Sequence, residues 1–265
     1  MIIIGEKINA TRKAIGKALE ERDADFIIKT AVEQAEAGAD YIDLNGGSPR
    51  KGQEAENMKW LMELVQANTD KPVAVDSADP QAVTVGLELA AQKPILNSIS
   101  LESDRLESML PIAGDHECMV VALLMSDDGT PTGADDRLER AEILLEKLTG
   151  IGKKLDELIV DPCFLPVSAD PSSGRAVIDA IARIHEKFPE VHIGGGCSNI
   201  SYGLPKRRIV NFALLSQAIY QGMDTGLIDP CIPGIVAMIL AAEAVAGKDD
   251  FCMNYVMAER EGKLG

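Results

Sequence analysis

Histidine is scarce in this sequence, with three residues among 265, and basic side chains are outnumbered. Catalytic zinc centres and many nucleophilic triads rely on histidines brought together at one site. His116 and His185 fall in or beside predicted helices and His192 begins a predicted strand, so we expect structural or solvated roles for all three. The 26 Lys and Arg residues face 42 Asp and Glu, for a net charge of −16, which argues against the basic stripe that nucleic acid binding requires.

Paired cysteines and long apolar runs are also lacking. The five cysteines are scattered and none stands in a Cys-x-x-Cys pair, and Cys197 is followed by Ser198 rather than by a second thiol. We therefore expect neither a disulfide framework nor a protein-bound metal. No apolar run approaches the roughly 20 residues of a membrane span, and the start of the chain has no leader pattern. These absences predict an unprocessed cytoplasmic protein without a membrane segment.

Short β-branched or apolar runs alternate with longer segments of helical periodicity, and there are eight such pairs. This alternation, with no linker between the pairs, predicts one domain over residues 1–265, folded as a TIM (β/α)8 barrel. The expected strands cover residues 2–5, 41–44, 73–75, 95–96, 119–124, 158–160, 192–194 and 226–228. The expected helices cover residues 24–37, 54–68, 80–91, 104–113, 136–150, 173–187, 206–221 and 233–246.

Small polar or acidic side chains follow nearly every expected strand. In a barrel these positions ring the mouth at the carboxyl ends of the strands, where barrel enzymes keep their chemistry. Helix capping is the alternative for any one cluster, since Asp, Asn and Ser are common caps. Capping does not explain why three aspartates lie within a residue of the apolar run, where they should point into the mouth: Asp43, Asp76 and Asp161.

The glycine-rich segment from His192 to Ser201 forms one part of this mouth. Gly194, Gly195 and Gly196 remove side chains where a backbone approaches a ligand, and they permit unusual backbone angles. A turn that merely leaves the strand is the alternative. The Asn199 amide that follows both donates and accepts hydrogen bonds, so it can follow a ligand atom through a change of protonation.

A planar heterocycle with adjacent N–H donors, such as a pterin or a guanine-like ring, suits a mouth rich in carboxylates and amides. One carboxylate can accept two parallel hydrogen bonds from such an edge. Two basic clusters, Arg50-Lys51 and Lys206-Arg207-Arg208, follow mouth loops. They are candidates to hold an acidic tail of the ligand, and a solvated helix start is the alternative for each.

Taken together, the motifs resemble the methyltetrahydrofolate:corrinoid methyltransferases. The resemblance covers about residues 2 to 255 in order, and rests on Gly-Glu-Lys-Ile-Asn at 5–9, Asp-Leu-Asn at 43–45, Val-Asp-Ser at 75–77, Leu-Asn-Ser at 96–98, Val-Asp-Pro at 160–162 and Gly-Cys-Ser-Asn-Ile-Ser at 196–201. It implies a homodimeric, pterin-binding barrel that exchanges a methyl group between tetrahydrofolate and a corrinoid. The corrinoid, a cobalamin, is expected on a separate partner protein, since this chain has no Asp-x-His-x-x-Gly carrier signature.

The resemblance also assigns residues. It implies that Asp76, Asn97 and Asp161 hold the pterin ring and that Asn199 hydrogen-bonds the methyl-bearing nitrogen at pterin position five, while Arg207 and Asn211 lie near the mouth. We accordingly predict Asn199 and Asp76 as catalytic. The full predicted tetrahydrofolate-binding set is Glu6, Asn9, Asp43, Asn45, Asp76, Asn97, Asp161, Gly195, Gly196, Ser198, Asn199 and Arg207.

Several alternatives stay open at this point. A pterin-binding subunit without catalysis would share most of these residues. A dihydropteroate synthase-like enzyme is a poorer match because its Ser-x-Arg-Pro-Gly type motif and strand-seven lysine are missing, and an aldolase would have only Lys7 as a strand-end lysine. The direction of methyl transfer, the corrinoid partner, tetrahydromethanopterin in place of tetrahydrofolate, and the proton source (Asp43, Asp76 or water) are not decided by the sequence.

Overall fold

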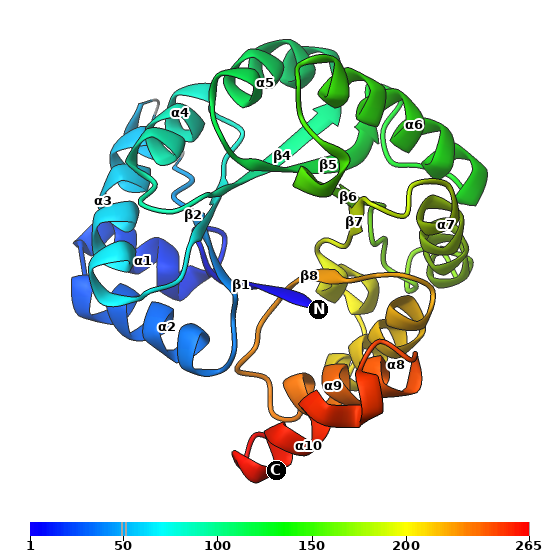
Figure 1. The fold of residues 1–265 in the computed structure, drawn as a ribbon. Coiled ribbons are helices and arrows are strands. Elements are labelled where there is room, and N and C mark those ends of the chain that lie inside the picture. The colour runs from blue at the N-terminus through cyan, green and yellow to red at the C-terminus, as the bar shows by residue number, and fades with distance from the viewer. Residues whose placement is uncertain (49, 51, 265) are drawn as a thin grey trace.

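A computed structural model, which describes residues 1–48, 50 and 52–264, contains eight parallel strands arranged around one axis (Figure 1). The strand order β7-β6-β5-β4-β3-β2-β1-β8 is that of a barrel, with β7 and β8 at the seam. Backbone hydrogen bonds from Leu227 N to Gly195 O (2.9 Å) and from Asp224 N to Ile193 O (3.1 Å) join this seam. The strands are β1 Ile2–Asn9, β2 Tyr41–Asn45, β3 Val73–Asp76, β4 Ile95–Leu101, β5 Met119–Ser126, β6 Leu158–Asp161, β7 His192–Ile193 and β8 Thr225–Ile228.

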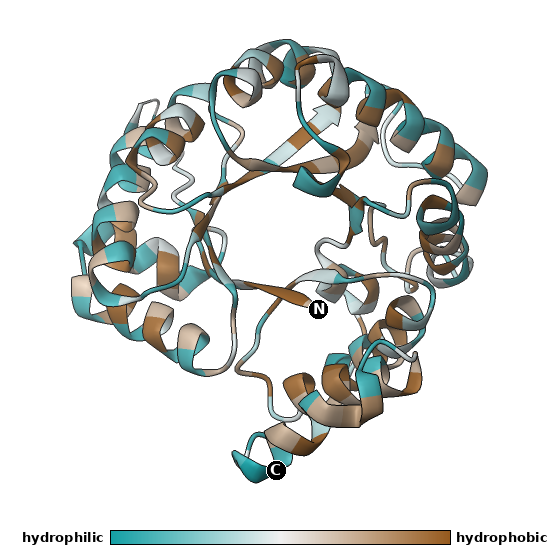
Figure 2. Ribbon diagram, in the orientation of Figure 1, coloured by the Kyte–Doolittle hydropathy of each residue, from teal (hydrophilic) through white to brown (hydrophobic). Residues whose placement is uncertain are grey.

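Helices surround the strands and pack on them through apolar faces (Figures 1 and 2). In α7 the buried residues Val177, Ala180, Ile181 and Ile184 recur at helical spacing, which places one face against the sheet. The helices are α1 Lys13–Glu21, α2 Ala24–Glu36, α3 Gln53–Asn68, α4 Pro80–Leu89, α5 Ser103–Asp115, α6 Ala134–Gly150, α7 Ser173–Lys187, α8 Arg207–Tyr220, α9 Ile235–Val245 and α10 Met253–Arg260, with short 3-10 turns at η1 Leu155–Glu157, η2 Cys197–Ser201 and η3 Asp250–Cys252.

Two apolar layers stabilise the barrel. The larger lies between the strands and the helices, and the smaller fills the inside of the barrel. The inner layer consists of Ile4, Ala74, Ile95, Met119, Val121 and Ile159, with Ile2, Tyr41 and Leu227 packed against it. It lies toward the amino-terminal ends of the strands, so the barrel interior remains polar and open only toward their carboxyl ends.

The predicted barrel and all eight strand–helix pairs are confirmed, but several boundaries were wrong. The prediction ended the first strand at Gly5, whereas β1 continues to Asn9 through a register shift between Gly5 and Ile8. β4 likewise continues through two register shifts to Leu101. Such bulges re-aim side chains next to functional sites, and a polar residue inside a bulged strand looks like a loop in the sequence.

Helices α1 and α10 were not predicted, because the barrel pattern asks for one helix per strand. In α1 the buried residues Ile15, Ala18 and Leu19 have the spacing of a helix face, so the local signal was present. Among the described residues, no helix is long and apolar enough to cross a membrane.

Candidate active site

The polar mouth residues lie one step beyond the inner apolar layer. Side chains alternate along a strand, so a residue two positions after an inward-facing apolar residue also faces the interior. Each of four strands follows this rule with an apolar residue and then a polar one: Tyr41 and Asp43, Ala74 and Asp76, Ile95 and Asn97, Ile159 and Asp161. The barrel therefore presents a layer of carboxylates and amides directly above its apolar plug.

Side-chain amides connect the carboxylates on the β1–β4 side of this layer. Asn97 Nδ2 donates to Asp43 Oδ1 (3.0 Å), while Asn45 Nδ2 and Asn9 Nδ2 donate to Asp76 Oδ2 (3.0 and 3.4 Å). Asp43 is 1% exposed, and its Oδ2 is buried without a hydrogen-bond partner. A buried carboxyl oxygen without a partner is costly, so this atom invites a ligand donor or must carry a proton.

Burial governs the ionisation of this pair. It raises the pKa of Asp43 well above its ordinary value, and the nearby negative charge of Asp76 raises it further. The pKa of Asp76 is raised by burial as well, although the Asn45 hydrogen bond and the Arg105 guanidinium oppose that shift. Two close carboxylates of this kind titrate as a pair, and burial favours the protonated form of both.

Asp161, on the β6 side, is held by backbone N–H groups instead. Its Oδ1 accepts from Cys163 N (2.9 Å) and its Oδ2 from Gly196 N (3.3 Å). Burial among protein atoms raises the pKa of Asp161 to about 6, against these two hydrogen bonds, which favour the charged form.

The glycines of the 194–196 segment are explained by close packing and not by unusual backbone angles. A Cβ on Gly194 would lie 1.8 Å from Thr225 O, and a Cβ on Gly195 would lie 2.0 Å from Asp161 Oδ2. None of the three glycines has a positive φ, and Gly196 has φ −70°. The three glycines therefore make no use of a positive φ, and their close neighbours are β8 and the Asp161 carboxylate. Close approach to a ligand stays a prediction.

Asn199 lies in the 3-10 turn η2, directly after these glycines. It is exposed, and among the described residues its side-chain amide has no protein hydrogen-bond partner. Arg207, in the first turn of α8, donates from Nη2 to Ser198 O (2.6 Å) and from Nε to Ser201 Oγ (3.0 Å), so it holds the turn on both sides of Asn199.

A cavity of about 740 Å³ opens at this mouth, within the usual size of ligand pockets. Seven predicted site residues line it: Glu6, Asn9, Asp43, Gly196, Ser198, Asn199 and Arg207. The other five do not line it, but each lies against a residue that does or against another member of the layer: Asn45, Asp76, Asn97, Asp161 and Gly195. The remaining lining residues are Thr11, Arg12, Tyr202, Arg208, Asn211, Leu227, Asp229 and Ile232.

Sequence reasoning did not single out Arg12 and Tyr202. Arg12 stands three residues after Asn9, and Tyr202 stands three residues after Asn199. This closeness to a predicted site residue was the available sequence signal for both. Of the basic clusters, Lys206 is the N-cap of α8, which agrees with a helix start, and the following Arg207 and Arg208 line the cavity, so a contact with an acidic tail of the ligand stays a prediction. For the other cluster, Lys51 lies outside the described residues.

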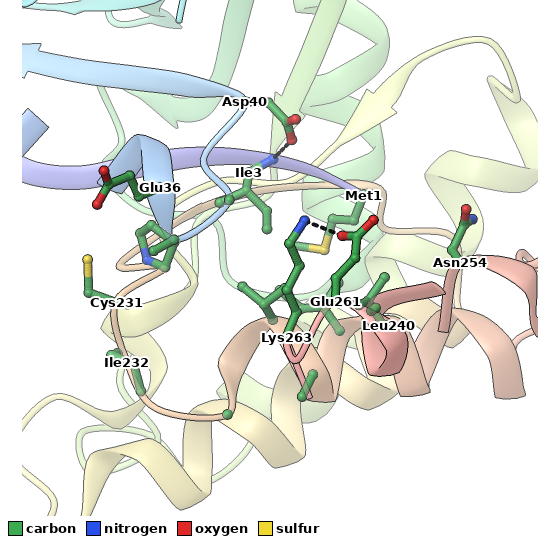
Figure 3. A pocket seen from close by; sticks show the side chains of 18 of the residues that line it. Met1, Ile3, Glu36, Asp40, Cys231, Ile232, Leu240, Asn254, Glu261 and Lys263 are labelled. Atoms are coloured by element: carbon green, nitrogen blue, oxygen red, sulfur yellow. Dashed lines mark hydrogen bonds and ion pairs between the residues drawn. The ribbon is translucent and has the colours of Figure 1, made fainter. Parts of the chain in front are cut away.

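A second cavity, of about 760 Å³, lies outside the barrel between the end of α2 and helices α9 and α10 (Figure 3). Some of its polar groups are paired with one another: Asp40 accepts from Ile3 N (2.8 Å) and Lys263 pairs with Glu261 (2.7 Å). No predicted site residue lines it. The mouth cavity is therefore the candidate active site.

In the part of the chain that the structure describes, no group of three or more His, Cys, Asp or Glu is placed to hold a metal ion. His192 pairs with Asp224 (2.7 Å) at the start of β7, and His116 Nδ1 lies 2.8 Å from Ile112 O. Cys197 is buried, and burial raises the pKa of its thiol.

Comparison with known proteins identifies the family. The model of the family described as "Pterin binding enzyme" matches residues 5–229. The chain is also 34% identical to the methylcorrinoid:tetrahydrofolate methyltransferase of Eubacterium limosum, with 100% of this chain and 98% of the relative covered. The chain belongs to the pterin binding enzyme family. The full-length relation confirms the predicted resemblance and, with it, an enzyme of the methyltransferase class.

Two more distant similarities agree with this assignment. Methionine synthase of Mycobacterium tuberculosis is 25% identical over 86% of this chain, which spans 20% of that longer protein. A dihydropteroate synthase structure from Xanthomonas albilineans superimposes with a TM-score of 0.72 over 94% of this chain and 92% of that one, at 18% identity. The latter likeness shows the fold alone, and it confirms the barrel.

Proposed function

We propose that this enzyme transfers a methyl group between nitrogen five of tetrahydrofolate and the cobalt of a corrinoid carried by a separate protein. One observation carries the proposal: the unpartnered Asn199 amide and the Asp43 carboxylate, which belongs to the carboxylate–amide layer, line a single cavity. The names of the relatives, a methylcorrinoid:tetrahydrofolate methyltransferase and methionine synthase, support the same substrates.

The residues present fit a pterin ring. The ring edge offers adjacent N–H donors, and the buried Oδ2 of Asp43 lacks a donor. Asp76 and Asp161 supply further acceptors, and Asn97 supplies both kinds of group. Gly195 gives the Asp161 carboxylate room, and Gly196 N donates to it. We propose that the predicted set other than Glu6 binds the ring in this layer, with Asn9, Asn45, Ser198 and Arg207 around it, while Glu6 holds Ser198 from the cavity wall. A buried polar layer of this kind rejects analogues that lack the matching groups.

The chemistry requires positive charge on the pterin nitrogen. A methyl group on a neutral tertiary amine is a poor electrophile, because the leaving group would be an anion. When bound, the corrinoid supplies the cobalt that accepts or donates the methyl group. Asn199 Oδ1 accepts a hydrogen bond from the protonated nitrogen, or its Nδ2 donates to the neutral one, so one side chain serves both directions of transfer.

We place the proton for that nitrogen on the Asp43–Asp76 pair. Burial raises the pKa of both carboxyls, and the charge of Asp76 raises that of Asp43 further, so this pair takes up a proton more readily than ordinary carboxylates; it also lies in the same polar layer as the proposed ring site. Asp76 thus has the predicted catalytic role, and Asp43 shares the proton with it.

A spectroscopic assay tests the proposed function. Methylcobalamin or a methylated corrinoid protein is mixed with the enzyme and tetrahydrofolate, and the methylcobalamin absorption band is followed together with the formation of methyltetrahydrofolate. Loss of the band with stoichiometric product is the expected result. Pterin binding without loss of the band, in either direction of transfer, would indicate a binding subunit and contradict the proposal.

We further propose that the protein is a homodimer, as the family resemblance implies, and that it is cytoplasmic, as the scattered cysteines indicate. Five exposed apolar side chains gather in α9, η3 and α10, and a patch of this kind is typical of an interface: Val245, Phe251, Met253, Val256 and Met257. The molar mass in solution should be twice 28.4 kDa and should fall for a V245E/F251E variant. I143E, on α6, is the control because Ile143 is also exposed but lies outside the patch.

A further inference from the structure

Glu6 is the only predicted site residue on the bulged part of β1, and it faces the turn that bears Asn199. Its side chain is 16% exposed and lies in the wall of the mouth cavity. Ser198 Oγ donates to the Glu6 carboxylate, at 3.2 Å from Oε2 and 3.4 Å from Oε1. Two residues 192 positions apart in the chain are thus joined across the seam of the barrel.

The other side of the same turn is held by Arg207. Its Nη2 donates to Ser198 O (2.6 Å), and Ser201 Oγ donates to that same oxygen (3.1 Å). Ser198 is therefore fixed through both its side chain and its carbonyl. Asn199 follows it directly, and its exposed amide has no protein partner of its own among the described residues. Whatever fixes Ser198 therefore limits the backbone positions from which the Asn199 side chain can reach into the cavity.

The charges around Glu6 keep it in this role. Arg12 Nη2 donates to Glu6 Oε1 (3.0 Å) from the turn before α1. Burial raises the pKa of Glu6, while Arg12, the Ser198 hydrogen bond and Arg207 favour the charged form and Asp229 disfavours it. An ionised carboxylate is the stronger acceptor for Ser198.

We propose that Glu6 is a positioning residue, which acts on methyl transfer through Ser198 by holding the η2 turn so that the Asn199 amide faces the reacting nitrogen. This inference rests on the proposed function for its catalytic part. It differs from the predicted role of Glu6 as a direct pterin ligand, because the contact that matters here is with the protein.

Hydrogen–deuterium exchange tests the structural part without any activity. We expect E6A to raise deuterium uptake in residues 197–202 at least about threefold over the wild type, and E6Q, which retains an acceptor for Ser198, to raise it less. D127A is the matched control, because Asp127 accepts a hydrogen bond from Ser103 Oγ in another mouth loop. Unchanged uptake in E6A, or an equal rise at this turn in D127A, would overturn the proposal.

A double-mutant cycle tests the catalytic part. In the wild-type background E6A should lower the single-turnover methyl-transfer rate about tenfold or more, with E6Q between the two and the pterin dissociation constant within about twofold. In the N199A background E6A should lower the rate less than about twofold, because the side chain that Glu6 positions is gone. Equal losses in both backgrounds, or a large loss of pterin affinity without a change in exchange, would contradict the inference.

These two measurements separate this inference from the proposed function. If the wild-type protein moves no methyl group while exchange at η2 rises in E6A, the proposed function fails and the positioning of the turn stands. If the wild-type protein transfers the methyl group and E6A changes neither exchange nor rate, the inference fails and the proposed function stands.

Discussion

The two sides of the mouth are built differently. On the β1–β4 side, carboxylates and amides stand on strands and bond one another through their side chains, as Asn97 does with Asp43. On the β6–β7 side, Asp161 accepts from backbone N–H groups, and Asn199 stands exposed on a 3-10 turn. Side chains on strands are fixed more firmly than those on turns. We infer that the first side recognises the ring and supplies the proton, while on the second side Asp161 completes the ring contacts and Asn199 responds to the charge on the reacting nitrogen.

The largest effect is expected from replacing Asn199, which tests the role of the turn in the reaction. N199A should lower the methyl-transfer rate about 100- to 1,000-fold, since it removes a hydrogen bond that strengthens as charge develops on the pterin nitrogen. Pterin affinity, measured by fluorescence titration of the same variant, should remain within a few-fold. A transfer rate within threefold of the wild type, with the pterin still bound, would show that the turn has no role in the reaction.

Replacing Asp76 tests the strand side, where we expect a loss of pterin binding. D76N should weaken pterin binding about 10- to 100-fold, because a hydrogen bond to a charged acceptor contributes about 1.5 to 3 kcal/mol. D79N is the control: Asp79 caps α4 from the same β3–α4 connection, and asparagine is also a good cap. If D76N and D79N bind the pterin equally well by calorimetry, the strand side is not the recognition side.

The sequence allowed the strand side to be predicted better than the turn side. In β3 and β6 the aspartate stands two residues after an inward apolar residue, so alternation alone places it in the barrel. Asn9 and Glu6 were assigned to a loop because a bulge cannot be read from residue types. The partners of Ser198 are Glu6 and Arg207, one of them 192 residues away, and only the closed barrel brings them together.

The arginines that anchor the mouth loops were also beyond the sequence. Arg137 is 1% exposed, and it donates to Pro162 O (2.6 Å) and Cys163 O (3.1 Å), which fixes the loop after Asp161. Arg105 donates in the same way to Ser77 O and Ser98 O. In the sequence each stands on an expected helix among other charged residues, where a solvated position is the ordinary expectation.

Replacing Gly195 tests how closely the glycine-rich segment packs against Asp161. An added methyl group would lie 2.0 Å from Asp161 Oδ2, so G195A should displace the carboxylate, at a cost of about 1 to 3 kcal/mol in the free energy of unfolding. Pterin affinity should fall with it, while the Asp43–Asn97 contact stays intact. G150A is the control, since a Cβ there meets nothing within 4 Å. Equal denaturation midpoints for G195A and G150A would mean that the close approach is easily relieved.

The smallest expected effect is a change of pterin affinity with pH, which we assign to Asp161 on the β6 side. The pKa of Asp161 is raised to about 6, so its carboxylate is ionised above that pH and takes a proton as the pH falls through it. The charged form is the one that accepts from the ring, so pterin affinity should be full at pH 7 and above and should fall toward tenfold per unit below about pH 6. Asp43, Asp76 and Glu6 titrate in the same cavity, so D161N is needed to isolate this step. Titrations from pH 5 to 8 should show the step near pH 6 in the wild type and not in D161N; a step that persists in D161N would assign it to the strand side instead.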